Sequence, residues 1–295
     1  FLTPVWNELW WDSSVHQEEP LLLEFQKDEQ SLGIAPLMRQ GDTITLMGDP
    51  DLFDYQDFII LKEFEQECFD SLISYLDDQP WSQLTFPSLR EDSQTLNFLP
   101  EIANRKGWHC VTEIHDVAPG VLLPNNWDSY LTNLHKKNRH ELRRKFRRLT
   151  TVTSSTTICS KPDEIQTCIE DLFALMRKGR EEKRRFLTED HEAFFRAIAS
   201  GLSEIGIVTL HFLELDKVRV ASCLCFDYNG QRLLYNSGFN PEHSNLSVGL
   251  LLKASCLGDS ISKGLEYFDF LKGDEQYKYH LGGIDRVVYK LSITR

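Results

Sequence analysis

Residues 232–252 read RLLYNSGFNPEHSNLSVGLLL, and this stretch decides the fold. It completes a β-rich run at residues 235–241 and, after a short loop, enters an apolar helix close to Ser247 and Gly249. The first N–H groups of a helix have no acceptor within the helix, so a strand, a loop and a helix start in this order can hold phosphate oxygens. The same serine and glycine are also ordinary capping residues, and we expect the Ser247 hydroxyl to cap this helix.

The segments on either side of this stretch predict an α+β fold. The hydrophobic period changes from 3.6 to 2 near residue 207, and Asn229-Gly230 is a strong hairpin signal. In the second half, helices are expected at 131–149, 162–177, 188–202 and 247–262, and strands at 207–215, 218–228, 232–239, 267–271 and 286–293. In the first half, helices are expected at 54–76 and 94–106, and strands at 21–25, 33–39, 43–47, 83–86, 111–114 and 121–123. The two halves share an element order, which indicates an old duplication or a coincidence of two α+β domains.

Charge and tryptophan content divide the chain near residue 125. Residues 1–125 hold 6 Lys and Arg against 23 Asp and Glu, whereas residues 126–295 hold 26 against 22. All six tryptophans lie at or before Trp127. Pro124-Asn125-Asn126 follows an apolar run and favours a turn. We therefore expect an acidic domain over 1–125 and a second domain over 126–295.

A second informative segment, DFLKGDEQYK at residues 269–278, follows the next expected strand. Together with residues 235–241, Ser247-Val248-Gly249 and a basic helix around 139–148, it resembles the GNAT superfamily of N-acetyltransferases, specifically its cellulose-biosynthesis CelD-like branch. The resemblance covers residues 131–282, with a looser one at 34–55. The superfamily loop has Gln or Arg, two residues, Gly, one residue, and Gly or Ala. Here Ser244 and Ser247 take the first two places and only Gly249 fits.

This resemblance implies a tandem of two acyl-CoA N-acyltransferase-like (GNAT-like) domains, each a mixed, mostly antiparallel sheet flanked by helices, with a degenerate first copy. It also implies acetyl-CoA as co-substrate, held through backbone amides and without a metal. The residues expected to hold it are Asn236, Ser237, Gly238, Ser244, Ser247, Val248, Gly249 and Leu250.

Direct acyl transfer needs a base for the attacking amine and a proton donor for the departing thiolate. Asp269 or Asp274 is a candidate base, and Tyr277 or Tyr279 is a candidate acid. Each also has an ordinary structural interpretation, Asp274 as a turn residue and the tyrosines as half-buried aromatic residues.

The basic helix expected at 131–149 carries eight Lys and Arg between residues 136 and 148 against one acid, and only Asn138 and Lys145 interrupt its apolar stripe. Its face suits an acidic saccharide, a nucleic acid or an anionic membrane surface, and an acidic neighbouring domain could also neutralise it. Nucleic acid is not the expected partner, because no interleaved aromatic residues or nucleic-acid motif accompany it. Arg139, Arg143 and Lys278 are the candidate substrate-binding residues.

The seven cysteines are scattered and odd in number, which predicts reduced buried thiols in a cytoplasmic protein. Cys223 and Cys225 share a strand face, but no second pair or histidine stands at ligand spacing, so no metal site is expected. Apolar stretches fall far short of the roughly 20 residues that cross a bilayer. Loops typical of nucleoside triphosphatases, serine hydrolases and zinc proteases are absent.

We therefore expect an acyl-CoA-dependent N-acetyltransferase whose acceptor is an amine, in a context that includes polysaccharide or cell-envelope biosynthesis. Two alternatives stay open. One is a Fem-type aminoacyl or peptidyl transferase, also a tandem of this fold. The other is a non-catalytic binder of an anionic saccharide or partner. Specificity lies in loop contacts, so the acceptor itself is not encoded in these motifs.

Overall fold

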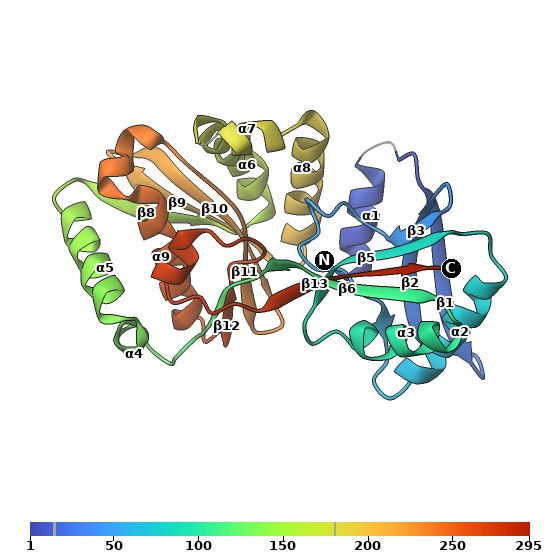
Figure 1. Cartoon of the computed structure of the whole chain (residues 1–295). Coiled ribbons are helices and arrows are strands. Elements are labelled where there is room, and N and C mark those ends of the chain that lie inside the picture. Colours follow the sequence, from blue (N-terminus) through green and yellow to red (C-terminus); the bar gives the residue numbers. More distant parts are fainter. Residues whose placement is uncertain (14–15, 180) are drawn as a thin grey trace. The chain divides into compact units, whose positions relative to one another are not determined.

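The computed structural model describes residues 1–13, 16–179 and 181–295 and divides into two compact units. Unit 1 contains residues 1–117 and 286–295, and unit 2 contains residues 118–285. In each unit, helices cover a mixed β-sheet (Figure 1), so the expected α+β class is confirmed. Within the described ranges, every helix is too short or too polar to cross a membrane.

Unit 1 is built on a sheet in the order β1-β2-β3-β5-β13-β6, with β4 paired to β2. Only β3 and β5 run parallel. Its helices are α1 (Pro4–Asp12), α2 (Glu65–Asp77) and α3 (Gln94–Arg105), and its strands are β1 (Glu19–Lys27), β2 (Gln30–Gln40), β3 (Thr43–Leu46), β4 (Ile59–Ile60), β5 (Gln83–Arg90), β6 (His109–Val117) and β13 (Val287–Thr294). The expected helix at 54–76 begins only at Glu65, because residues 59–60 pair with β2 instead.

The boundary between the units differs from the one expected at residue 125. The structure divides the chain after Val117 and assigns residues 286–295 to unit 1. The physical reason is strand pairing, because β13 lies between β5 and β6 and is antiparallel to both. Leu291 and Ile293 of β13 are fully buried in the unit 1 core. The strand expected at 121–123 likewise changes unit, since β7 (Gly120–Leu122) pairs with β12 of unit 2.

Unit 2 is built on a sheet in the order β7-β12-β11-β10-β9-β8. Its remaining strands are β8 (Ser154–Cys159), β9 (Val208–Leu215), β10 (Val218–Tyr228), β11 (Gln231–Phe239) and β12 (Tyr267–Asp269). Its helices are α4 (Trp127–Asn133), α5 (Lys136–Leu149), α6 (Pro162–Lys178), α7 (Glu181–Phe186), α8 (Glu189–Ser203), the 3-10 helix η1 (Pro241–Leu246), α9 (Val248–Ser262) and α10 (Gln276–His280). The pair β11–β12 is parallel and the other pairs are antiparallel.

Local chemistry explains the hairpin that leads into the decisive stretch. Asn229 and Gly230 both have positive φ angles, 47° and 73°, as the tightest hairpin turns require. They join β10 to β11 in the expected register, with Tyr228 opposite Gln231. The strand order therefore places β11 beside β12, and α9 follows β11 in sequence and covers one face of this sheet, while α6 and α8 cover the other (Figure 1).

The basic helix expected at 131–149 is in fact two helices. Leu134 is extended, with ψ at 144°, and ends α4. His135 then starts α5, its side chain accepting the N–H of Lys137 at 3.4 Å. Both helices still bury the expected stripe, including Leu131 and Leu142. Both helices pack on the same core, so the apolar residues keep the 3.6-residue period across the break at Leu134 and the sequence pattern does not show it.

Candidate active site

The sheet of unit 2 opens between β11 and β12. The two strands pair only through residues 231–233 and 267–269. Just beyond, the register between β10 and β11 shifts, since Cys225 faces Leu234 whereas Leu224 faces Asn236. Tyr235 is thus the extra residue of a β-bulge, which bends a strand and ends its regular pairing. Beyond the bulge, β11 carries peptide groups that β12 does not pair, in the described part of the chain.

The start of α9 lies at the end of this opening. Ser247 is left-handed, with φ 57° and ψ 36°, and the helix has no side-chain cap. The expected cap by the Ser247 hydroxyl is therefore wrong. A helix leaves its first N–H groups without intrahelical acceptors, here those of Val248, Gly249 and Leu250. These donors, together with the helix dipole, favour an anion at this point.

Two glycines let neighbouring elements approach the opening closely. A Cβ on Gly238 would lie 2.4 Å from the backbone nitrogen of Met176, so β11 and α6 meet there at backbone distance. A Cβ on Gly249 would lie 3.2 Å from the ring of Phe239. Gly249 therefore brings the first turn of α9 against the end of β11, and its bare face points to that ring.

Lys145 completes the positive site, and sequence reasoning missed it. Its ammonium donates to the Ser247 hydroxyl at 2.6 Å and pairs with Glu141 at 3.4 Å. The side chain is only 22% exposed. The second interruption of the apolar stripe, Asn138, also contacts a candidate segment, because its amide donates to the Tyr279 carbonyl at 3.3 Å. Polar residues within an apolar helix stripe were the available signal.

Lys253 joins the α9 start to Tyr277. This lysine is 7% exposed, its ammonium lies 4.6 Å from the centre of the Tyr277 ring, and it donates a long hydrogen bond of 3.5 Å to the Gly249 carbonyl. Tyr277 is half-buried and packs edge-on against Phe270. Lys253 thus connects the expected loop at Gly249 with the expected tyrosine, Tyr277, and sequence reasoning did not identify this lysine.

The two candidate bases differ in environment. Asp269 is 1% exposed, and its Oδ1 accepts the N–H of Leu271 at 2.8 Å. That contact, with Leu271 at φ 60°, ends β12 two residues before the expected end at residue 271. Asp274 lies on the exposed loop that follows. Asp269 is therefore a turn-forming carboxylate in this structure, whereas Asp274 faces solvent.

Lys278, expected to bind substrate, is instead a loop anchor. It is 1% exposed, and its ammonium donates to the carbonyls of Leu271, Lys272 and Gly273 at 2.6 to 3.0 Å. It also pairs with Glu275 at 2.9 Å, and this charge lowers the pKa of that carboxyl although burial opposes it. All three ammonium protons have acceptors, so the side chain fixes the loop around Asp274.

The remaining expected residues lie at different points of unit 2. Asn236 is 7% exposed, and its Oδ1 accepts the Lys183 ammonium at 2.7 Å and the Ser237 N–H at 3.0 Å. Ser244 is exposed in η1, and its carbonyl accepts the N–H of Ser247 at 2.9 Å. Arg139 donates to the Thr132 carbonyl at 3.0 Å and so ties α5 to α4.

Arg143 is not gathered at the opening. It lines a hollow of about 520 Å3 on the side of α5 that faces α4, with Trp127, Phe146 and Arg147 among its neighbours. Among the described residues, no ion pair involves Arg143, Arg147 or Arg148. The three candidate substrate residues therefore have different roles: Arg139 links α5 to α4, Arg143 lies on an exposed cationic face, and Lys278 is buried and holds a loop.

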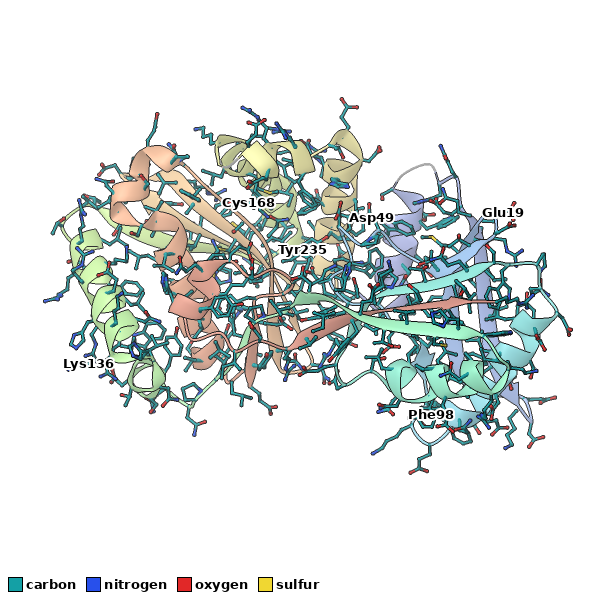
Figure 2. All side chains as sticks on the ribbon, viewed as in Figure 1. Glu19, Asp49, Phe98, Lys136, Cys168 and Tyr235 are labelled. Atoms are coloured by element: carbon teal, nitrogen blue, oxygen red, sulfur yellow. The ribbon has the colours of Figure 1, made fainter. Side chains whose placement is uncertain are left out.

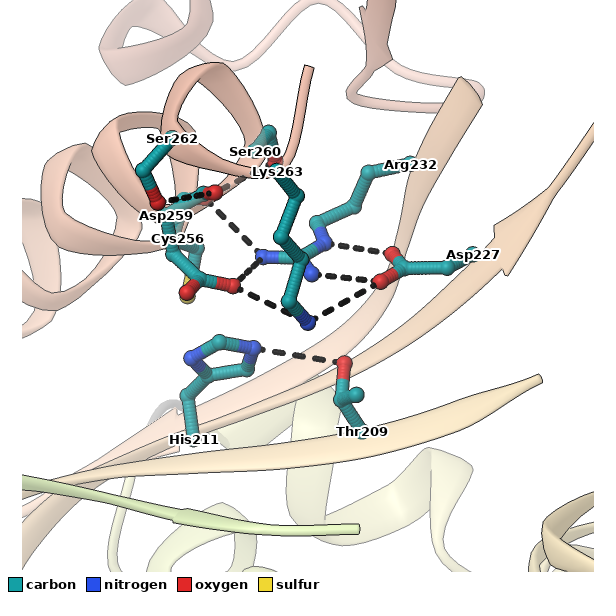
Figure 3. Close-up of polar contacts among 9 residues, drawn as sticks. All are labelled: Thr209, His211, Asp227, Arg232, Cys256, Asp259, Ser260, Ser262 and Lys263. Atoms are coloured by element: carbon teal, nitrogen blue, oxygen red, sulfur yellow. Dashed lines mark hydrogen bonds and ion pairs between the residues drawn. The ribbon is translucent and has the colours of Figure 1, made fainter. Parts of the chain in front are cut away.

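A buried polar cluster lies under α9 (Figure 3). Arg232 is completely buried and pairs with Asp227 at 2.5 Å and Asp259 at 2.7 Å. Beside it, ligand atoms of His211, Cys225 and Cys256 lie within 4.8 Å of one another. His211 stands opposite Cys223 on the neighbouring strand, which the search for a nearby histidine along the sequence did not reveal.

We assign this cluster to the core and not to a metal. Burial and the charge of Arg232 lower the pKa of His211 to about 4. The same neighbouring positive charge that disfavours a proton on the ring disfavours a bound cation. The ring nitrogen Nε2 lies 3.2 Å from the Thr209 hydroxyl, so the neutral imidazole has a hydrogen-bond partner. The expectation of no metal ligand set stays a prediction.

Comparisons with known proteins place this geometry in a family context. Residues 136–279 match the family described as "Acetyltransferase (GNAT) domain". No curated protein matches the sequence. FemX has a TM-score of 0.64 at 12% identity, over 98% of this chain and 90% of that chain. L-PGS from Bacillus licheniformis has a TM-score of 0.60 at 10% identity, over 94% and 84%. A tandem GNAT protein from the clavulanic acid biosynthesis pathway has a TM-score of 0.50 at 11% identity, over 97% and 86%.

Identities this low establish the fold alone, whereas the family match extends over most of unit 2. The structural neighbours include a tandem GNAT protein, which agrees with the expected class. The chain therefore has a GNAT-like fold, and its residues 136–279 match the family of GNAT acetyltransferase domains.

Proposed function

We propose that this protein transfers an acyl group, in the first place acetyl, from coenzyme A to an amine of an acceptor. The observation that carries the proposal is the opening between β11 and β12 beside the uncapped start of α9. An acyl-CoA thioester has an amide-bearing arm that suits a free strand edge, and a diphosphate that suits the free amides of a helix start.

In this proposal, different residues of unit 2 bind different parts of the acyl-CoA donor. The amides of the half-buried Gly249 and Leu250 and the ammonium of Lys145 bind the diphosphate, whereas Val248 beside them is fully buried. The peptide groups of β11 beyond the bulge bind the arm, and Gly238 keeps α6 close behind it. The serine that replaces the usual glycine of the loop leaves backbone amides available and adds the Lys145 contact.

Acyl transfer then needs no covalent enzyme intermediate. The acceptor nitrogen attacks the thioester carbon, the C–N bond forms, and the C–S bond breaks as the thiolate leaves. Tyr277 protonates that thiolate, and the Lys253 ammonium over its ring stabilises the resulting phenolate. Asp274 is the favoured base, because the Asp269 carboxylate already holds the turn after β12. Tyr279 remains the alternative acid.

The acceptor follows from the resemblance to the CelD-like branch, which favours an amine on a polysaccharide or cell-envelope precursor in the cytoplasm. The exposed cationic face formed by Arg143, Arg147 and Arg148 supports an acceptor that carries negative charge.

A Fem-type reaction is the second candidate, since the likeness to FemX extends over 98% of this chain. In that case the cationic face meets the donor RNA. A non-catalytic binder of an anionic saccharide is the third. The first two candidates differ in the donor that binds at α9, and the third differs from both in having no turnover.

Thermal melts with acetyl-CoA, coenzyme A and an aminoacylated transfer RNA distinguish the candidates. A ligand at one hundred times its Kd adds about 2.7 kcal/mol to the stability of the folded state. We expect acetyl-CoA and coenzyme A to raise the melting temperature. A rise with the charged RNA alone contradicts the proposal and favours the Fem-type reaction. Binding of acetyl-CoA without thioester cleavage toward any amine favours the non-catalytic binder.

A further inference from the structure

Two cysteines outside the proposed chemistry lie against each other at the outer edge of unit 2. Cys159 ends β8, the edge strand of the sheet, and Cys168 lies on α6 (Figure 2). Their Sγ atoms are 2.8 Å apart. Both residues line an open hollow of about 510 Å3, with exposed fractions of 7% and 6%. A small oxidant in water can therefore reach the sulfurs.

The guanidinium of Arg219 contacts both sulfurs. Its Nη1 donates to the Cys168 sulfur at 3.2 Å and its Nη2 to the Cys159 sulfur at 3.7 Å. An ion pair with Asp171 at 2.6 Å holds the group in place. A positive charge beside a thiol favours the thiolate, which is the nucleophile of sulfur oxidation.

The two thiols are not equivalent. Burial and the neighbouring Cys168 sulfur raise the pKa of Cys159 to about 12. The shorter guanidinium contact belongs to Cys168. Cys168 is thus placed to react first, and Cys159 lies in contact to react second.

We propose that Cys159 and Cys168 form an oxidation site that a hydroperoxide, such as hydrogen peroxide, converts to a disulfide. The Cys168 thiolate attacks one peroxide oxygen, the S–O bond forms, the O–O bond breaks, and the leaving hydroxide takes a proton to give water. The Cys159 sulfur then attacks the sulfenic acid, the S–S bond forms, and the second oxygen leaves as water. Two thiols lose two electrons and two protons, and one peroxide becomes two waters.

The other close cysteines provide an internal comparison. Cys223, Cys225 and Cys256 are at most 1% exposed beneath α9. Burial and the neighbouring sulfurs raise the pKa of Cys256. Burial opposes ionisation of Cys223 too, but the contact with Cys256 and the charges of Lys253 and Arg232 lower the pKa of Cys223. Peroxide must reach the sulfur as well as find a thiolate, so these enclosed thiols are expected to stay reduced under conditions that oxidise the more accessible pair at β8.

The test uses the full chain and intact mass. The protein is treated with hydrogen peroxide, unfolded, alkylated with N-ethylmaleimide and digested. We expect a mass loss of two hydrogens, two fewer alkylated cysteines, and one cross-linked peptide pair containing Cys159 and Cys168. The bond should raise the melting temperature by about 5 °C or more, because it removes chain entropy from the unfolded state. Dithiothreitol should reverse both changes.

Four variants make the test specific. Cys159→Ser should lose the disulfide and accumulate a sulfenic acid at Cys168 that dimedone traps. Arg219→Met should slow oxidation by about tenfold, and Arg219→Gln, which also removes the charge but keeps a polar side chain, covers the case in which Met impairs folding. Lys161→Met is the matched control, since its charge is nearby but 79% exposed and paired with Glu164. Full alkylation of both thiols after peroxide, or a disulfide that maps to the cysteines under α9, overturns the proposal.

Discussion

Replacing Lys145 by methionine tests the proposed diphosphate site most directly. The change keeps the length and the apolar stem of the side chain but removes the ammonium that contacts Ser247 at 2.6 Å. Folding should survive, because Glu141 keeps its bidentate partner Arg144. The helix start itself is unchanged, so its backbone amides remain in place.

The magnitude follows from the position of the charge. Lys145 is 22% exposed, so its interaction with a phosphate is neither fully screened nor deeply buried. A hydrogen bond to a charged group contributes about 1.5 to 3 kcal/mol. At 1.4 kcal/mol for each factor of ten, the loss corresponds to about 10- to 100-fold in Kd. Lys145→Arg should recover part of this loss.

Isothermal titration with two ligands isolates the phosphate contribution. Acetyl-CoA carries the diphosphate, whereas acetyl-pantetheine carries the same thioester arm without phosphate. We expect Lys145→Met to weaken the first ligand and to leave the second unchanged. Lys136→Met is the control, because that lysine is exposed at the start of α5, away from Ser247.

Equal losses for both ligands would show that Lys145 acts through the fold. Unchanged affinity for acetyl-CoA in a folded variant would remove the α9 start from the donor site, and with it the main support for acyl-CoA as the donor.

Three further outcomes test the fold of unit 2. Gly238→Ala should lower the free energy of unfolding in urea by about 1 to 3 kcal/mol, since its Cβ would lie 2.4 Å from an α6 backbone nitrogen, whereas Gly258→Ala, whose Cβ would lie 3.5 Å from a ring, should not. The pKa of His211 in the fold is about 4, below its ordinary 6.5, so stability should fall by about 3 kcal/mol from pH 6.5 to 4, and His211→Gln should flatten that slope in denaturant melts. Arg232→Met should cost about 3 to 5 kcal/mol, because Asp227 and Asp259, 17% and 22% exposed, lose their fully buried partner and keep only Lys263, whereas Lys263→Met, 40% exposed, should cost less than about 1 kcal/mol; equal costs would contradict the burial argument.

Local signals in the sequence predicted the parts of the fold that depend on neighbouring residues. The Asn229-Gly230 turn, the stripe of α6 and the strand, loop and helix around Ser247 all follow from spacing along the chain. The closing strand was assigned to the wrong unit, because β13 pairs with strands some 200 residues earlier in the chain. Which strand edge it joins depends on pairing register, and the local sequence pattern does not specify that choice.

The site was predicted in part for the same reason. The loop and Tyr277 carry a motif, so they were named in advance, and the structure joins them through Lys253. Lys145 reaches the site from α5, 102 residues before Ser247, and no pattern relates the two positions. Lys278 had the expected residue type, but its burial against three carbonyls depends on the path of the loop.

The return of the last ten residues to unit 1 makes unit 2 an insertion into a host domain. The two ends of the insert meet, since Gly120 and Ile284 exchange backbone hydrogen bonds at 3.0 and 2.9 Å. The cut ends of the host also meet, since Val287 stands opposite Val117. We therefore expect residues 118–285 to fold when expressed alone, and a short turn from Val117 to Val287 to close the host. In the natural order, the ribosome must finish the insert before the host sheet receives β13, the strand that joins β5 to β6.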